Sequence, residues 1–264
     1  MKEGFVLGME FTLYHVDIFL LILVRVTGFI FVAPFFSLKN VPMRVKAGIS
    51  CLLAIVLFNI VPYQTFNYAS NYEYIFLIAK EVILGLMIGF FANIGYYILA
   101  LVGHMIDTEI GFSMVSTLDP VTNIQVTITS NLYTYLVMLM MMVTNLHHYF
   151  IKAFVDTYEI IPLGEGVINP NLYSMMVAYM TNYFIIGFRI VIPIFGAILI
   201  VNVTLGILAK VAPQMNMFVI GMQLKVFVGL IMLYFVVQML PAVSDFIFNQ
   251  MLGAMKDAIY ALKG

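Results

Sequence analysis

The sequence predicts an all-α protein that crosses a membrane with about six hydrophobic helices. Hydrophobic residues make up 63% of the chain and charged residues only 9%, whereas a soluble domain carries about 25% charged residues. The apolar residues gather in long runs that do not alternate, as the ~10-residue strands of a membrane barrel would. Because lipid offers the backbone no hydrogen bonds, spans of this kind are expected to be helical.

Six apolar runs account for the predicted helices. They cover residues 18–36, 45–61, 75–102, 132–146, 172–209 and 215–240. At ~1.5 Å per residue the first run reaches about 29 Å, close to one hydrocarbon thickness. The fourth run is short for a span, and an extension backwards into 124–130 would lengthen it. The fifth run is longer than a span needs and contains Pro193, so we expect a kink or a break there.

The connections between runs carry topological information. Lys39, Arg44 and Lys46 form the densest positive cluster, which the positive-inside rule assigns to the cytoplasm, with the N-terminus outside. Residues 244–264 alternate apolar and charged side chains, which indicates a terminal amphipathic helix lying on a surface or on a partner. No linker, low-complexity tract or repeat interrupts the chain, so residues 1–264 are expected to form a single domain.

Signatures of chemistry are missing from the sequence. There is no P-loop and no H-E-x-x-H motif, and residues 111–115 start like a nucleophile elbow but lack its final glycine. The adjacent His147 and His148 have no nearby cysteine or spaced carboxylate, so we expect neither a metal nor another cofactor. The net charge of −1 suggests no nucleic-acid partner. We therefore expect a non-enzymatic protein without catalytic residues.

Five ionisable residues interrupt the apolar runs. They are Arg25, Lys80, Glu81, Arg189 and Lys225. A charge at membrane depth costs roughly 2.5–3.5 kcal/mol on insertion scales, so such residues normally face protein or a water-filled cavity. Two interpretations remain open for each: a path for an ion or a polypeptide, or pairing between helices. Together they predict that these helices do not all lie bare in lipid.

Two features of the third run predict close helix contacts. Glu81 needs an opposite charge, which Arg25 or Arg189 could supply. Gly85 and Gly89 form a Gly-x-x-x-Gly motif, a smooth face against which another helix can pack closely. Either a helix of this chain or a helix of another subunit could fill that role.

Residues 103–123 break the apolar pattern. Gly111 permits a turn, and Asp119-Pro120 is typical of a turn or a helix start. The apolar tip between them comprises Phe112, Met114 and Val115. Irregular backbone at membrane depth persists only where protein or a cavity covers it. A loop of this kind could close a pore, or it could be an ordinary interfacial loop.

Several short motifs stand out against the apolar background. They are Arg25-Val26-Thr27-Gly28, Ala33-Pro34-Phe35-Phe36-Ser37, Ile106-Asp107, Leu118-Asp119-Pro120, Leu224-Lys225 and the run from Gly206 to Gly221 that contains Lys210 and Asn216. With these motifs the sequence resembles the FliR family of flagellar export-gate proteins, whose injectisome counterpart is called SctT, over essentially its whole length. It departs at Gln223, where members of that family often carry proline.

The resemblance implies a fold and a role. Residues 1–174 would form a FliP-like part, and residues 175–264 a FliQ-like hairpin with the C-terminal amphipathic helix. The chain would help to form and plug the channel through which unfolded flagellar proteins cross the inner membrane at the flagellar basal body. FliP and FliQ would be its partners, together with the FlhB and FlhA export-apparatus proteins, membrane lipid and the exported cargo.

The resemblance also implies roles for residues. Gly111, Phe112, Met114 and Val115 would belong to the channel plug. The polar contacts between helices or subunits would be made by Arg25, Glu81, Asp107, Arg189, Lys210, Asn216 and Lys225. An ion-coupled secondary transporter is the alternative; it would need paired intramembrane carboxylates or broken helices in two matched halves, and only Pro193 hints at the latter.

Overall fold

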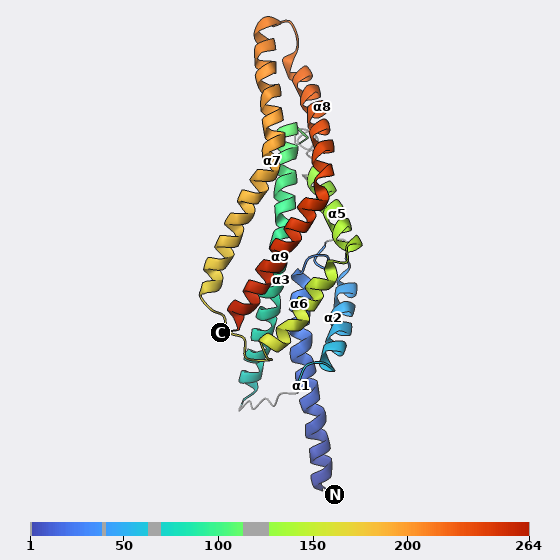
Figure 1. Ribbon diagram of the computed structural model, residues 1–264. Coiled ribbons are helices and arrows are strands. Elements are labelled where there is room, and N and C mark those ends of the chain that lie inside the picture. Colours follow the sequence, from blue (N-terminus) through green and yellow to red (C-terminus); the bar gives the residue numbers. More distant parts are fainter. Residues whose placement is uncertain (1, 39–40, 63–69, 113–126, 264) are drawn as a thin grey trace. The chain divides into compact units, whose positions relative to one another are not determined.

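The computed structural model describes residues 2–38, 41–62, 70–112 and 127–263. These residues contain eight α-helices and no strand, which confirms the all-α prediction (Figure 1). The helices are α1 (Lys2–Val32), α2 (Met43–Phe58), α3 (Asn71–Ile110), α5 (Ile128–Val143), α6 (His147–Ile160), α7 (Asn171–Val211), α8 (Met217–Gln238) and α9 (Leu240–Leu262).

Four of these helices are long and apolar enough to cross a membrane. The apolar stretches cover His15–Val32, Asn71–Ile110, Asn171–Val211 and Met217–Gln238, and Ile128–Val143 is a shorter apolar helix. The multi-spanning prediction is confirmed, and within the described residues the second and fourth predicted runs form helices shorter than a full span. The second run forms a helix of only 16 residues, about 24 Å long at ~1.5 Å per residue, which is short of the ~30 Å hydrocarbon core.

The chain forms two compact units. Unit 1 comprises Met1–Ile94, Leu146–Val177 and Gln250–Gly264, and unit 2 comprises Gly95–Asn145 and Ala178–Asn249. Helices α3, α7 and α9 each contribute residues to both units. The unit boundaries therefore cut through helices, and no extended linker separates the units.

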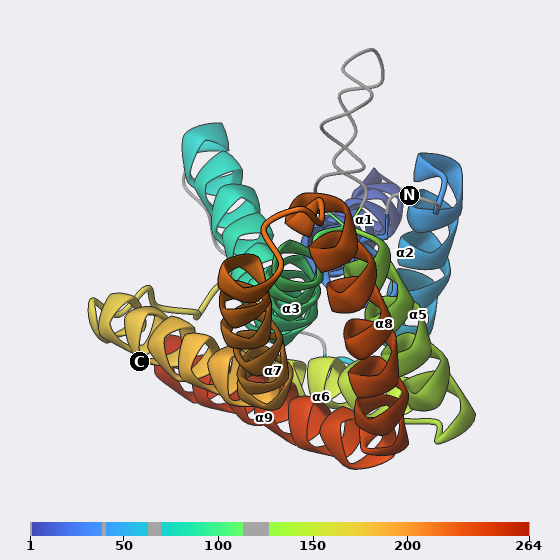
Figure 2. The ribbon, with the colours of Figure 1, turned by 90° about the horizontal axis from the view of Figure 1, so that it is seen from above.

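Aromatic side chains organise the core of unit 1. Phe29 of α1 stacks on Phe154 of α6 with ring centroids 4.1 Å apart, and Phe154 makes an edge contact with Tyr158. Phe58 of α2 makes an edge contact with Phe19 of α1, and α1 and α2 lie side by side in two perpendicular views (Figures 1 and 2). Stacked and edge-on ring pairs of this kind add specific geometry to apolar burial.

Helix α3 continues where the sequence suggested an interruption. It runs to Ile110 through the polar stretch that begins at Gly103. Gly103 is buried, and a Cβ atom there would lie 2.1 Å from the Cα of Ser130. The glycine therefore serves a close helix contact inside unit 2.

Helix α6 was missed by the analysis of apolar runs because it is amphipathic. Its buried face carries Phe150, Phe154 and Tyr158, and its exposed face carries Lys152 and Asp156. The apolar residues recur every three to four positions, so no continuous run appears in the sequence. Helical periodicity was the signal that would have found it.

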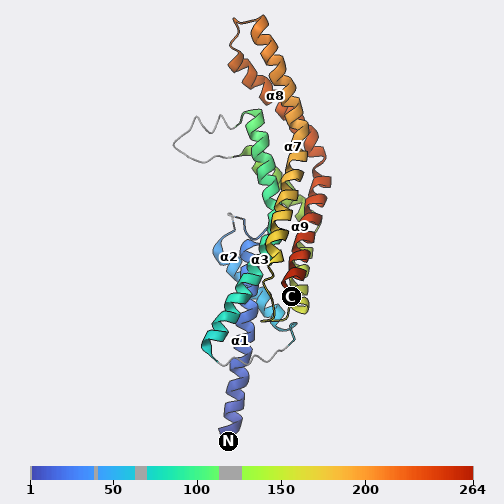
Figure 3. The same cartoon turned by 90° about the vertical axis from the view of Figure 1, so that its left-hand side faces the viewer.

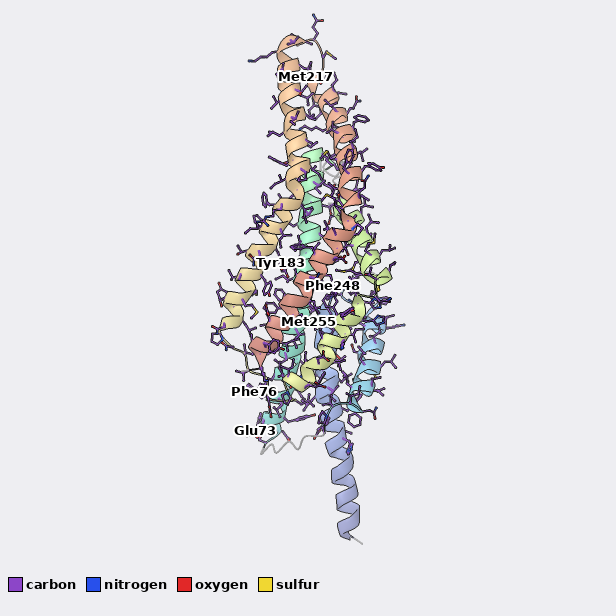
Figure 4. All side chains as sticks on the ribbon, in the orientation of Figure 1. Glu73, Phe76, Tyr183, Met217, Phe248 and Met255 are labelled. Atoms are coloured by element: carbon purple, nitrogen blue, oxygen red, sulfur yellow. The ribbon has the colours of Figure 1, made fainter. Side chains whose placement is uncertain are left out.

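Unit 2 contains most of α7 and all of α8, which form a helical hairpin (Figures 1 and 3). Pro193 lies inside α7, which continues as one helix, so a break at this residue is wrong. Proline has no N–H, so the carbonyl of Arg189 lacks its usual partner four residues on. The unit 2 part of α7 bends in Figure 1. Met217, the first residue of α8, lies beside the hairpin turn (Figure 4).

The C-terminal helix is amphipathic, as the sequence predicts, but its apolar face is covered by its own chain. Met251, Met255, Ala258 and Leu262 are buried, whereas Lys256 is exposed; Met255 is labelled in Figure 4. The end of α9 is also tied to unit 1, because the N–H of Val167 donates to the carbonyl of Leu262 at 2.9 Å. The buried residues of α9 are therefore covered inside unit 1, and a contact of this helix with a membrane surface or a partner stays a prediction.

Candidate functional site: buried charges in unit 1 and a closed loop base in unit 2

Three glycines bring the backbones of α1 and α3 together. A Cβ atom at Gly85 would lie 2.1 Å from the carbonyl oxygen of Arg25, and one at Gly89 would lie 2.9 Å from that of Phe29. Gly28 faces α3 in the same way, because a Cβ atom there would lie 2.8 Å from the carbonyl oxygen of Val82. The Gly-x-x-x-Gly motif thus serves a contact inside this chain, and Gly28 is the partner that sequence reasoning missed.

Close backbone approach places Arg25 of α1 against Glu81 of α3. The guanidinium donates from Nη2 to Oε1 of Glu81 at 2.9 Å and from Nε to Oε2, so the ion pair is bidentate. Both side chains are fully buried. Bidentate arginine–carboxylate pairs are strong and strictly oriented. Of the two partners that the sequence offered Glu81, the structure pairs it with Arg25, while Arg189 is exposed on α7.

The same charges also bind backbone. Arg25 donates from Nη1 to the carbonyl of Ile161 at 2.9 Å and from Nη2 to that of Pro162 at 3.4 Å. Glu81 accepts the N–H of Gly164 on Oε1 at 2.7 Å. Lys80 donates to the carbonyl of Gly164 at 2.8 Å, so its ammonium is bound by backbone instead of reaching out of the membrane as a lysine near a helix start often does.

Tyr158 of α6 covers the ion pair. The Arg25 guanidinium carbon lies 4.6 Å from the centre of the Tyr158 ring, which is a cation–π contact. The Tyr158 hydroxyl donates to the carbonyl of Ile22 at 3.4 Å. Burial raises the pKa of Tyr158, so the phenol stays neutral at physiological pH and keeps its proton for this bond.

Asp107 ties the end of α3 to the start of α5. Both of its carboxylate oxygens accept the N–H of Thr129 at 3.1 Å, in the first turn of α5. Thr127, the N-cap residue, makes no side-chain cap of its own. Asp107 therefore satisfies a free N–H at the positive end of the helix dipole, although it comes from another helix. The two ends of the intervening segment are held together in unit 2.

The start of that segment is partly described. Gly111 ends α3 with φ of +95°, which agrees with the turn that the sequence predicts there. Phe112 is half-buried. Met114 and Val115, the other expected plug residues, lie outside the described residues.

An open cavity of about 510 Å³ adjoins this turn in unit 2. The end of α3 lines it with Glu109 and Gly111, α7 with Asn202, and α8 with Met217 and Lys225. A lysine inside an apolar run is expected to face protein or a water-filled cavity, and Lys225 does so here.

The remaining sequence-predicted residues, Arg189, Lys210 and Asn216, lie on the α7–α8 hairpin in unit 2. Arg189 and Lys210 are exposed on α7. Asn216 is the N-cap of α8, where its side-chain oxygen accepts the N–H of Val219 at 3.5 Å. Within the part of the chain that the structure describes, no three histidine, cysteine, aspartate or glutamate side chains are grouped to hold a metal ion.

The fold and these sites define a multi-spanning helical membrane protein whose buried charges bind its own backbone. Residues 16–251 match the family described as "Bacterial export proteins, family 1", and the chain belongs to this family. This family comprises non-enzymatic proteins of the flagellar and type III export apparatus, so the chain is an export-apparatus protein of the bacterial inner membrane.

Relatives from both branches of the family match most of the chain. The flagellar biosynthetic protein FliR of Bacillus subtilis is 27% identical over 246 residues, covering 91% of this chain and 94% of the relative. FliR of Escherichia coli is 25% identical over 242 residues, with 91% and 92% covered. The Yop proteins translocation protein T of Yersinia pestis is 26% identical over 204 residues, with 75% and 77% covered.

Proposed function

We propose that this chain is a subunit of the flagellar protein export gate, where it helps to form the channel and closes it with the segment that follows α3. The plug would comprise Gly111, Phe112, Met114 and Val115. The tie between Asp107 and the first turn of α5 carries the proposal. A plug must be held firmly at its base while its tip is free to yield, and both ends of this segment are fixed to one another.

The partners follow from the family. FliP and FliQ would complete the channel, and FlhB and FlhA would join them, while unfolded flagellar proteins pass through. The hairpin of α7 and α8 would be the FliQ-like part of the proposed division at residues 174 and 175. Its surface supports a place among neighbouring subunits or lipid, because large apolar side chains such as Ile200, Phe218 and Phe227 are exposed.

Deletion of residues 111–117 tests the plug. The variant chain should assemble with its partners, and the membrane should become permeable to small solutes, because nothing then fills the closed channel. The measurement is uptake of a small impermeant dye in cells that carry the variant. A deletion of equal length at residues 63–69 is the control and should leave the membrane tight.

Two outcomes contradict the proposed function. Unchanged permeability in a fully assembled 111–117 deletion would refute the plug. Transport of a small solute by the purified chain alone in liposomes would favour an ion-coupled carrier over a gate subunit.

A further inference from the structure

We propose that Arg25, Glu81 and Lys80 are positioning residues that anchor the connection between α6 and α7 and so fix where α7 begins. This connection, residues 161–170, is called the α6–α7 connection below. The anchor concerns the folding of unit 1, and it stands whether or not the chain plugs a channel.

The α6–α7 connection begins inside the protein. Ile161 and Leu163 are 1% and 2% exposed. Connections normally run over the surface, because buried backbone N–H and C=O groups need partners that a loop does not supply to itself. Here three charged side chains supply them, since Arg25 binds two carbonyls, Glu81 binds the N–H of Gly164 and Lys80 binds its carbonyl.

Mutual neutralisation alone does not account for this arrangement. A bidentate pair of Arg25 and Glu81 is already charge-balanced, yet each side chain has a further bond to the connection. Lys80 adds a second positive charge, which Glu81 cannot neutralise because it already neutralises Arg25. The excess positive charge is directed at carbonyl oxygens, whose partial negative charge accepts it.

The geometry downstream shows what the anchor fixes. Gly164 adopts φ of +79°, and a Cβ atom at Gly166 would lie 2.4 Å from the side chain of Leu84 on α3. The N–H of Val167 then donates to Leu262, and the side chain of Asn169 accepts the N–H of Asn171, the first residue of α7, at 3.0 Å. From the anchor to α7 the backbone is thus held at successive points.

A cysteine buried in the connection reports on the anchor. Leu163→Cys is introduced into a Cys51→Ser chain, because Cys51 is exposed and would react itself. The chain stays in its native membrane with its partners, and a membrane-permeable maleimide is the probe. The thiol at position 163 should react slowly, since protection follows local opening of the backbone around it.

The decisive variant removes both charges at once. Arg25→Met with Glu81→Met removes both charges of the pair, so neither is left buried without a partner. If the two residues only neutralise each other, the variant should accumulate normally in the membrane. The anchor instead predicts about tenfold faster labelling at position 163, because the backbone groups at 161, 162 and 164 lose their partners. The matched control, Lys152→Met with Asp156→Asn on the exposed face of α6, should label at the parent rate.

Lys80 gives an independent readout if the double variant does not accumulate. Lys80→Met removes the bond to Gly164 and strands no charge, and it should speed labelling about threefold at normal abundance. Lys80→Arg should restore slow labelling, because the guanidinium can donate to the same carbonyl. Parent-rate labelling in Lys80→Met, or in an accumulated Arg25→Met/Glu81→Met chain, would overturn the anchor. Dye uptake is measured in the same cells, so failure of the anchor and failure of the plug are separate results.

Discussion

At the scale of single residues, the described part of unit 1 contains a buried pair of opposite charges. Arg25 and Glu81 are fully buried and meet each other, Tyr158 and the backbone. Two opposite charges removed from water are tolerated only when each finds a full set of partners. Removing one charge of the pair should therefore destabilise the folded chain far more than removing both charges together.

Glu81→Ala should destabilise the chain strongly. It leaves the Arg25 guanidinium buried without its carboxylate, at a cost of about 3–5 kcal/mol. The measurement is the temperature at which half of the detergent-extracted protein aggregates, compared with the parent. Glu159→Ala, at an exposed position on α6, should change stability by less than ~0.5 kcal/mol. Equal melting of the two variants would contradict a paired Glu81.

At the scale of secondary-structure elements, helix contacts are set by the smallest side chains. The α1–α3 contact depends on Gly28, Gly85 and Gly89, and the α3–α5 contact depends on Gly103. In lipid, helices gain little from the hydrophobic effect, so close backbone packing carries much of their association. Any side chain added at these positions forces the helices apart.

Gly85→Ala should destabilise unit 1, near the upper end of the ~1–3 kcal/mol typical of overpacking. The new Cβ would lie 2.1 Å from the carbonyl oxygen of Arg25, and because that atom belongs to the backbone of α1, it cannot move aside as a flexible side chain could. Steady-state abundance in the membrane measures the effect. Gly253→Ala is the control, because a Cβ at that position in α9 meets nothing within 4 Å, and it should stabilise its helix by about 0.5–1 kcal/mol. Normal abundance of Gly85→Ala would refute this contact.

If the segment after α3 is the plug proposed above, Asp107→Ala should make the closed channel leak, though less than the 111–117 deletion does. It frees the N–H of Thr129 and unties the start of α5 from the end of α3. Glu109→Gln is the control two residues away, since that side chain lines the open cavity and is not part of the Asp107–Thr129 tie. Dye uptake that rises equally in both variants would indicate a general loss of charge and not a loss of this tie.

At the scale of the whole molecule, much of the apolar surface is left uncovered by the chain itself. In the 18-residue apolar window of each helix, only 17% of α8 and 28% of α7 is buried. An export-apparatus subunit presents such surface to lipid and to neighbouring subunits. The topology expected from loop charge, with the N-terminus outside, stays a prediction.

Phe227→Asp should disrupt assembly without unfolding the chain. Phe227 is 63% exposed on α8, so the substitution removes apolar surface that a neighbouring subunit could cover and adds a charge that an apolar helix surface cannot solvate. The measurement is co-purification of other hydrophobic subunits after gentle detergent extraction. Glu159→Lys is a surface-charge control. Undiminished co-purification would place the assembly interface on another face.

Prediction from sequence succeeded where a property depends on residues that lie close together along the chain. The long apolar runs indicated helices, and the Gly85–Gly89 spacing indicated a tight contact. It failed at α6, whose burial is periodic, and it did not reveal that residues such as Met255 of the C-terminal helix are covered by the chain itself. The α6–α7 connection gave no signal at all, because its buried backbone is matched by side chains from distant helices.

The sequence by itself determined that this chain is helical, spans a membrane and must shelter several charges. Those properties follow from the local cost of unpaired backbone and of ions in lipid. Only the tertiary structure decided that Glu81 meets Arg25, 56 positions away, and that Arg25 also reaches Ile161, 136 positions away. Such pairings depend on which helix faces pack against each other. A helix that carries small residues and a charge could pack against several other helices, and only the tertiary structure shows which pair forms.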